Sequence, residues 1–187
     1  MDEHEFIVSP RSRKELREIA GLVRQVCGCR EAKVDIVKLV EIDLARLDEG
    51  FVLHLPDRED MGDIEGLTNP IEKWIYIRAD VYDGACRGRG RDRMTIAHEL
   101  GHYLLHRQAD FPRIAKGAEI PVFRRSEWQA NTFAGELLIG VQHIHGCSEA
   151  QHIVDRFGVS FEAANVQLQV LRKEQLIIGG EVTMNTK

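Results

Sequence analysis

The sequence predicts a single α+β domain in which helices precede and follow a small sheet. The chain has 187 residues, a length that can bury one sizeable core. Residues 11–26 place apolar side chains three and four positions apart, as an amphipathic helix requires. Two short runs rich in β-branched and aromatic residues, 51–55 and 73–79, are typical of strands, and helical patterns resume at residue 94.

The composition is typical of a folded domain that does not cross a membrane. Hydrophobic residues make up 43% of the chain and charged residues 29%. Apolar runs are only a few residues long, whereas a membrane-spanning helix needs ~20. The first five residues, MDEHE, are acidic where a secretory signal would be basic, and the four cysteines are scattered and expected as thiols. We therefore expect a cytoplasmic protein without a membrane partner.

Charge is distributed unevenly along the chain. The net charge of −5 argues against a protein that merely coats nucleic acid. Residues 86–125, however, hold nine Arg and Lys against four Asp and Glu. This local excess indicates an anionic partner for the central stretch.

Local patterns predict each element in turn. Helices are expected at 11–26, at 34–43 with Asp35 near the start, at 94–107, at 126–138, after a Ser148–Gln151 capping box as far as Gly158, and from Ser160 onward. Strands are expected at 51–55 and 73–79, with a polar connection at 56–70, and residues 86–93 should form a turn or exposed loop. The sheet should be small, mostly antiparallel and packed against several helices. We expect one domain at 1–178 and a flexible tail at 179–187.

The segment that indicates chemistry is HELGH, residues 98–102. Positions four apart on a helix lie about 40° from each other around its axis, so His98 and His102 can both direct a ring nitrogen at one ion roughly 2 Å away. Glu99 leaves the same helix beside that ion, where it could accept a proton from water. Gly101 costs about 1 kcal/mol relative to Ala in a helix interior, which predicts that another segment passes close to it.

A third ligand has to come from another element. His106 lies about 12 Å from His98 along the helix axis, too far to share the ion. The helix at 126–138 offers Glu127 and Glu136, which lie on opposite faces, so only one of them can face the metal. Asn131 lies one turn after Glu127, where its amide could orient a ligand. The spacing favours Glu127 and leaves Glu136 open.

Two motifs together resemble the ImmA/IrrE family of metallopeptidases. They are TIAHELGHYLLH at 95–106 and EWQANTFAGELLIG at 127–140, and similarity extends upstream to AKVDIVKLVE and downstream to RFGVS. The resemblance covers about residues 12–175 and implies a compact zincin-like metallopeptidase domain. It also implies a gluzincin-like Zn²⁺ site in which His98, His102 and Glu127 hold the metal and Glu99 is the general base. At residues 136–140 this chain has ELLIG, and so it lacks the proline that commonly follows ELLM in relatives.

The resemblance further implies a substrate class. Its members cleave helix-turn-helix transcriptional repressors and so release the genes that these silence. They are usually encoded beside the repressor, in mobile elements, DNA-damage responses or anti-phage operons. A repressor-binding regulator without catalytic activity is the alternative, although an intact Glu99 argues against it.

Two features suggest control of such a site. Cys86 precedes His98 by twelve residues, and its thiolate could occupy the open coordination position of the zinc and inhibit the enzyme. Arg87, Arg89, Arg91 and Arg93 alternate through the same stretch and could contact single-stranded DNA as an activating signal. The alternatives are an inert thiol and an ordinary solvated face.

Two parts of the site stay open in the sequence. The strand at 73–78 could pair with an extended substrate segment, or it could be an ordinary strand of the sheet. The donor that stabilises the oxyanion could be any of four side chains. These are Tyr76, Tyr82, His143 and His145.

Overall fold

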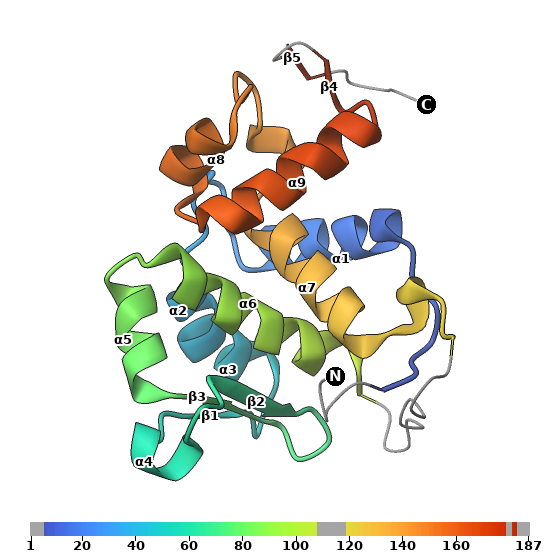
Figure 1. Cartoon of the computed structure of the whole chain (residues 1–187). Coiled ribbons are helices and arrows are strands. Elements are labelled where there is room, and N and C mark those ends of the chain that lie inside the picture. The colour runs from blue at the N-terminus through green and yellow to red at the C-terminus, as the bar shows by residue number, and fades with distance from the viewer. Residues whose placement is uncertain (1–5, 108–118, 179–180, 183–187) are drawn as a thin grey trace.

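The computed structural model describes residues 6–107, 119–178 and 181–182. It confirms the α+β class (Figure 1). A three-stranded sheet lies at one end of the molecule, the long helix α6 (Gly90–Leu105) packs on it, and α7 (Ser126–Leu138) packs on α6. Helix α1 (Arg13–Val26) covers α7 in turn, while α8 (Ala150–Phe157) and α9 (Phe161–Lys173) pack on each other at the far end. Helices α6 and α7 thus form the centre of the domain.

The remaining helical elements connect these layers. They are α2 (Ile36–Lys38), a π-helical turn η1 (Leu39–Leu44), α3 (Ala45–Leu47), α4 (Arg58–Met61), α5 (Ala79–Cys86), and the 3-10 turns η2 (Val122–Arg124) and η3 (Val141–His143). No helix among the described residues is both long and apolar enough to cross a membrane.

Local sequence signals explain where several helices begin. Ser12 and Glu15 form a reciprocal capping box at the start of α1. The side chains of Asp35 and Ser160 accept hydrogen bonds from backbone N–H groups at the starts of α2 and α9, as predicted. The predicted capping box at Ser148 was wrong, because Glu149 precedes α8 and makes no capping bond with its side chain. The predicted end of α8 at Gly158 is confirmed.

The sheet is mixed. Its strands are β1 (Val52–His54), β2 (Gly66–Asn69) and β3 (Trp74–Ile77), in the order β1-β3-β2. β3 pairs parallel with β1 and antiparallel with β2, so the expected antiparallel arrangement holds for one of the two pairs. The reason is that β2 runs opposite to β1, and the turn into β3 restores the direction of β1. Strand β2 and helix α4 both lie in the stretch 56–70, which was expected to be an irregular connection.

The stretch 86–93, which was expected to be a turn or exposed loop, belongs mostly to two helices. Helix α5 extends to Cys86, and α6 begins at Gly90, four residues before the expected start at Met94. The expected loop is therefore only a short turn between two helices.

The core is continuous through the layers. It includes fully buried side chains from α6, α7 and the sheet, such as Leu100, Tyr103, Phe133 and Ile75. The tail predicted at 179–187 lies outside the described residues except for β5 (Glu181–Val182), which pairs antiparallel with β4 (Ile177–Ile178).

Candidate metal centre

The site depends on a close approach of α6 and α7. A Cβ atom on Gly101 would lie 3.1 Å from Ala130 Cα and 3.1 Å from Phe133 Cδ1. The glycine in the middle of α6 therefore lets α7 pass close by, as its unfavourable helix propensity predicted. This packing brings Glu127, in the first turn of α7, beside the histidines of α6.

Three potential ligand residues converge there. His98 Nε2 and His102 Nε2 are 3.0 Å apart. Glu127 Oε2 lies 3.3 Å from His98 Nε2, and Glu127 Oε1 lies 3.0 Å from His102 Nε2. Ligands at 2.0–2.1 Å from one tetrahedral ion would be about 3.3 Å apart, so this set of two imidazoles and one carboxylate fits zinc. These three residues, predicted from HELGH and the resemblance, could together hold a metal ion.

The electrostatics of this group favour binding a cation. Burial would raise the pKa of Glu127, but hydrogen bonds from His102 and His98 outweigh it and hold that pKa well below its usual range. Burial likewise opposes the charged form of His98, yet its bond to Glu127 and the charge of Glu99 raise its pKa. The carboxylates thus supply the negative charge that a divalent ion would neutralise.

Glu136, the other candidate on α7, serves a different purpose. Its side chain is fully buried on the opposite face and accepts bonds from Arg13 Nη1 at 3.1 Å and Arg17 Nε at 2.8 Å. It therefore ties α7 to α1 and is not directed at the metal site.

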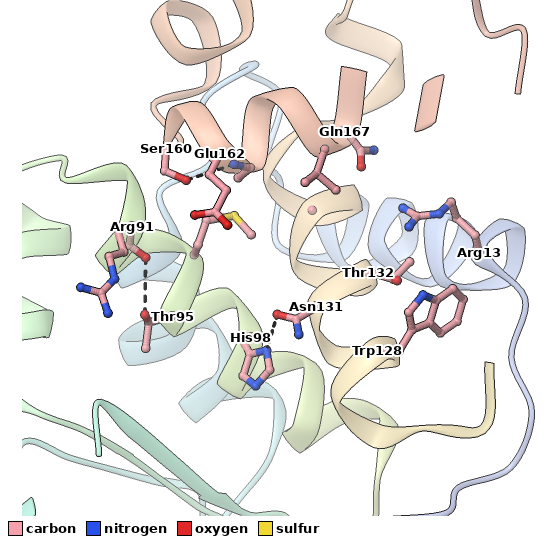
Figure 2. A pocket seen from close by; sticks show the side chains of 14 residues that line it. Arg13, Arg91, Thr95, His98, Trp128, Asn131, Thr132, Ser160, Glu162 and Gln167 are labelled. Carbon is pink, nitrogen blue, oxygen red and sulfur yellow. Dashed lines mark hydrogen bonds between the residues drawn. The ribbon is translucent and has the colours of Figure 1, made fainter. Parts of the chain in front are cut away.

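Asn131 lies where it can orient His98. The Oδ1 atom of Asn131 is 3.0 Å from His98 Nδ1 (Figure 2). With the proton on Nδ1, His98 donates this bond and keeps the Nε2 lone pair for a metal.

His102 has a longer chain of partners, which the sequence analysis did not predict. His102 Nδ1 is 3.0 Å from His106 Nδ1, and His106 Nε2 is 3.3 Å from Gln129 Oε1. Gln129 Nε2 in turn donates to the backbone carbonyls of Ser9 and Phe123. Burial, with the charge of His102, lowers the pKa of His106 to about 3, so its ring is neutral. The four-residue step from His102 to His106 was the available signal.

Glu99 is buried beside the ligands and is held by strand β2. Only 7% of Glu99 is exposed, and Thr68 Oγ1 donates to Glu99 Oε2 at 2.6 Å. A Cβ atom on Gly66 would lie 2.6 Å from Glu99 Cγ and 2.8 Å from Oε1. Neither Gly66 nor Thr68 was predicted as a site residue, because no strand was predicted at 66–69. The segment GLTN, residues 66–69, is too short for its pattern of apolar and polar side chains to indicate a strand.

A cavity of about 390 Å³ opens over the ligands. Among its lining residues are Phe6, Gly66, Thr68, Glu99 and Glu127. None of the four candidates for the oxyanion donor lines it, and Tyr82 instead donates to Glu41 on η1. Strand β3 is paired on both edges, so of the two alternatives for residues 73–78 the structure favours an ordinary strand of the sheet.

Cys86 is not with the ligands. It ends α5, is exposed, and lines a separate cavity with Lys38, Glu41 and Tyr82. From Gly90 to His98 the helix α6 rises about 12 Å, at 1.5 Å per residue, and Cys86 lies before that helix begins. Of the two alternatives for Cys86, the structure therefore favours a thiol apart from the ligands over coordination of the metal.

Arg93 was wrongly expected on an exposed loop. It lies inside α6, is only 4% exposed, and Arg93 Nη2 donates to the carbonyls of Val34 at 2.9 Å and Phe157 at 3.2 Å. The guanidinium links three distant parts of the chain and cannot contact nucleic acid.

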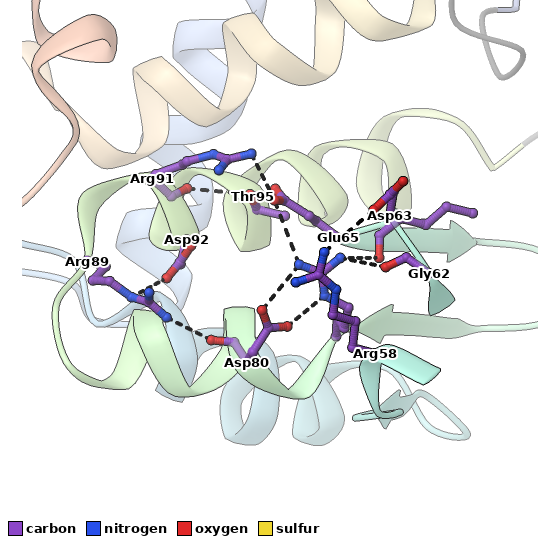
Figure 3. A network of polar contacts seen from close by, with 11 residues as sticks. Arg58, Gly62, Asp63, Glu65, Asp80, Arg89, Arg91, Asp92 and Thr95 are labelled. Carbon is purple, nitrogen blue, oxygen red and sulfur yellow. Dashed lines mark hydrogen bonds and ion pairs between the residues drawn. The ribbon is translucent and has the colours of Figure 1, made fainter. Parts of the chain in front are cut away.

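The other three arginines are exposed but paired. Arg87 lies 3.8 Å from Asp83, Arg89 lies 2.7 Å from Asp92, and Arg91 lies 2.8 Å from Glu65, with side-chain exposures of 65%, 58% and 75%. Figure 3 shows Arg89 and Arg91 within a network of acidic partners. Much of the positive charge inferred from the sequence is therefore neutralised locally.

Comparison with known proteins agrees with this geometry. The family described as Peptidase_M78, IrrE N-terminal-like domain, matches residues 58–169, more than half of the chain, including β2, α6 and α7. Neither the curated proteins nor the solved structures give a match. The chain belongs to the Peptidase_M78 family, whose members are metallopeptidases.

Proposed function

We propose that this protein is a zinc-dependent endopeptidase that cleaves a helix-turn-helix transcriptional repressor and thereby derepresses its operon. The observation that carries the peptidase activity is the convergence of His98, His102 and Glu127, with Glu99 fixed beside them. The resemblance to the ImmA/IrrE family supports the choice of substrate. On this proposal the protein acts in the cytoplasm, in a DNA-damage or antiviral response.

Each residue of the site has a distinct role in hydrolysis. His98, His102 and Glu127 would hold the zinc, which when bound supplies Lewis-acid activation of water and of the scissile carbonyl. Glu99 accepts a proton from the attacking water and delivers it to the amide nitrogen as the C–N bond breaks. Water thus adds its oxygen to the carbonyl carbon, and the products are a carboxylate and an amine. Thr68 holds Glu99 Oε2 during these transfers.

Strand β2 supports the binding of an extended substrate segment. It is an edge strand of the described three-stranded sheet, and its residues Gly66, Leu67 and Thr68 line the cavity over the ligands. The backbone groups on its free edge can pair with a substrate chain as an additional strand. This role replaces the one expected for β3.

The test is cleavage by the zinc-loaded enzyme of a helix-turn-helix repressor, sought first among the proteins encoded beside this one. Glu99→Gln should abolish cleavage while zinc content and repressor binding persist, because the amide cannot accept the proton. Glu59→Gln, at an exposed position on α4, is the matched control and should cleave normally. A zinc-loaded wild-type protein that binds the repressor without cutting it would instead support the non-catalytic regulator.

Single-stranded DNA remains our proposed activator, with three exposed arginines as its contacts. Replacing Arg87, Arg89 and Arg91 together by Gln should remove stimulation of repressor cleavage by an oligonucleotide, measured against the basal rate of the same variant. Stimulation that survives this triple substitution would contradict the proposal.

A further inference from the structure

Two further cavities flank the metal centre, one on the side of each histidine. A cavity of about 560 Å³ has His98 in its wall, and one of about 370 Å³ has His102 in its wall. Both histidines line the cavity over the ligands. A substrate chain that crosses the metal centre would therefore place side chains in the cavities on either side.

The cavity beside His98 lies between α6, α7 and α9 (Figure 2). Its apolar wall includes Met94, Trp128 and Val166. Gln167 from α9 also lines it, and only 2% of this residue is exposed. Gln167 Nε2 has no hydrogen-bond partner among the described residues. A buried amide donor without an acceptor is unfavourable unless a ligand supplies one.

The two arginines at this cavity already have partners, and an exposed acid on α9, Glu162, also lines it. Arg13 pairs with the buried carboxylate of Glu136 at 3.1 Å, and Arg91 pairs with Glu65 at 2.8 Å. The guanidinium charges are therefore largely compensated, so the cavity has no strong preference for an anion. Among the buried polar atoms of the described residues that line this cavity, the one without a partner is a neutral donor, Gln167 Nε2.

We propose that this cavity is a specificity subsite for a substrate side chain that carries an amide, with glutamine as the best fit. The side-chain carbonyl would accept from Gln167 Nε2, and the methylene stem would pack on Trp128 and Met94. This inference rests on the proposed peptidase function and names the residue that the peptidase selects beside the scissile bond.

The cavity beside His102 differs in chemistry and predicts the neighbouring residue. Its wall includes Phe6, Leu67, Ile71 and Trp74. A large apolar side chain fits these groups and needs no hydrogen-bond donor. The preferred substrate therefore carries an amide-bearing residue on one side of the scissile bond and a large apolar residue on the other.

The two tryptophans of the chain allow the subsites to be tested separately, because Trp128 lines the first and Trp74 the second. Zinc-loaded Glu99→Gln protein that also carries Trp74→Phe would be titrated with two acetylated, amidated alanine pentapeptides, whose central residue is Gln or Leu. Trp128 fluorescence should change with the Gln peptide, which should bind about fivefold tighter than the Leu peptide. Gln167→Leu should remove that preference, and Gln167→Met should do the same if the leucine variant does not fold.

The matched control is Gln151→Leu on the exposed face of α8, which should keep the fivefold preference. An unchanged preference in the Gln167 variants, or no response of Trp128 to either peptide, would overturn the subsite. Cleavage of the repressor by wild-type enzyme is measured separately. Failure there, with the peptide preference intact, would overturn the peptidase activity and leave the amide-binding cavity standing.

Discussion

At the level of single residues, the protonation pattern of two imidazoles decides whether a metal can bind. A neutral histidine has one N–H group and one lone pair, so a partner that accepts from Nδ1 leaves Nε2 for the metal. Asn131 is that partner for His98, and His106 is the partner for His102. Gln129 fixes the direction of the hydrogen bonds that run from His102 through His106. Its side-chain nitrogen donates to backbone carbonyls, so only its oxygen faces His106, as an acceptor.

Asn131 gives the clearest test of this arrangement. Asn131→Leu removes the acceptor for His98 Nδ1 and should weaken zinc affinity by about tenfold, measured by competition with a chromophoric chelator. Asn131→Asp, which keeps an acceptor at the same position, should retain most of the affinity. Equal zinc affinity in the leucine variant and the wild type would show that the bond does not orient the ligand.

Sequence spacing reveals residues on one helix better than residues brought together by the fold. The histidines and Glu99 follow from a five-residue pattern, and Glu127 from a second motif within the resemblance. Thr68 and Gly66 lie more than thirty residues before Glu99, on a strand whose pattern is weak. Only their packing against α6 gives them a role, so no local signal could have assigned it.

At the level of elements, the fit of β2 against α6 positions Glu99, the proposed general base. Gly66→Ala would place a Cβ atom 2.6 Å from Glu99 Cγ, so the carboxylate or the strand has to shift. We expect kcat for repressor cleavage to fall at least about tenfold, while zinc affinity changes little because the three atoms nearest to the added Cβ all belong to Glu99, which is not one of the proposed ligands. Gly21→Ala on α1 is the control, since its Cβ would meet nothing within 4 Å. A normal kcat for Gly66→Ala would exclude this positioning role.

The elements that were predicted correctly have strong local signals. The apolar spacing of α1 and the capping serine of α9 lie within a few residues of the helices they define. The start of α6 was predicted four residues too late, because arginines and glycines indicate a loop in isolation. In the structure Arg93 can be buried within the helix because its guanidinium donates hydrogen bonds to the carbonyls of Val34 and Phe157. Such tertiary contacts override local propensity.

At the level of the whole molecule, Asp48 joins segments that are distant in the chain. It follows α3 and accepts a hydrogen bond from Tyr103 Oη on α6 at 2.9 Å. Lys73 Nζ, beside β3, lies 2.9 Å from Asp48 Oδ1, the other oxygen of the same carboxylate. Arg107, beyond the end of α6, also pairs with Asp48. The bond from Lys73, with those from Arg107 and Tyr103, lowers the pKa of Asp48 to about 2. This carboxylate thus links the sheet to the helix that carries the candidate ligands His98 and His102.

The sign of this pKa shift predicts how acid affects the fold. Because the folded-state pKa of Asp48 is about 2 and the unfolded value is about 3.9, its stabilisation is complete above about pH 4 and is lost as the pH falls through 2. Asp48→Asn should lower the free energy of unfolding at pH 7 by about 1–2 kcal/mol, and the difference from wild type should disappear near pH 2.

Urea denaturation across this pH range measures the effect, with chelator present throughout so that loss of metal at low pH does not contribute. Asp63→Asn is the matched control, because that side chain is fully exposed and lies 3.6 Å from Arg58, and it should change the free energy of unfolding little at any pH. If Asp48→Asn and wild type differ equally at pH 7 and pH 2, the stabilisation comes from packing around the side chain. A difference that vanishes in acid can come only from the charged form, and it would establish this junction as an electrostatic link between the sheet and α6.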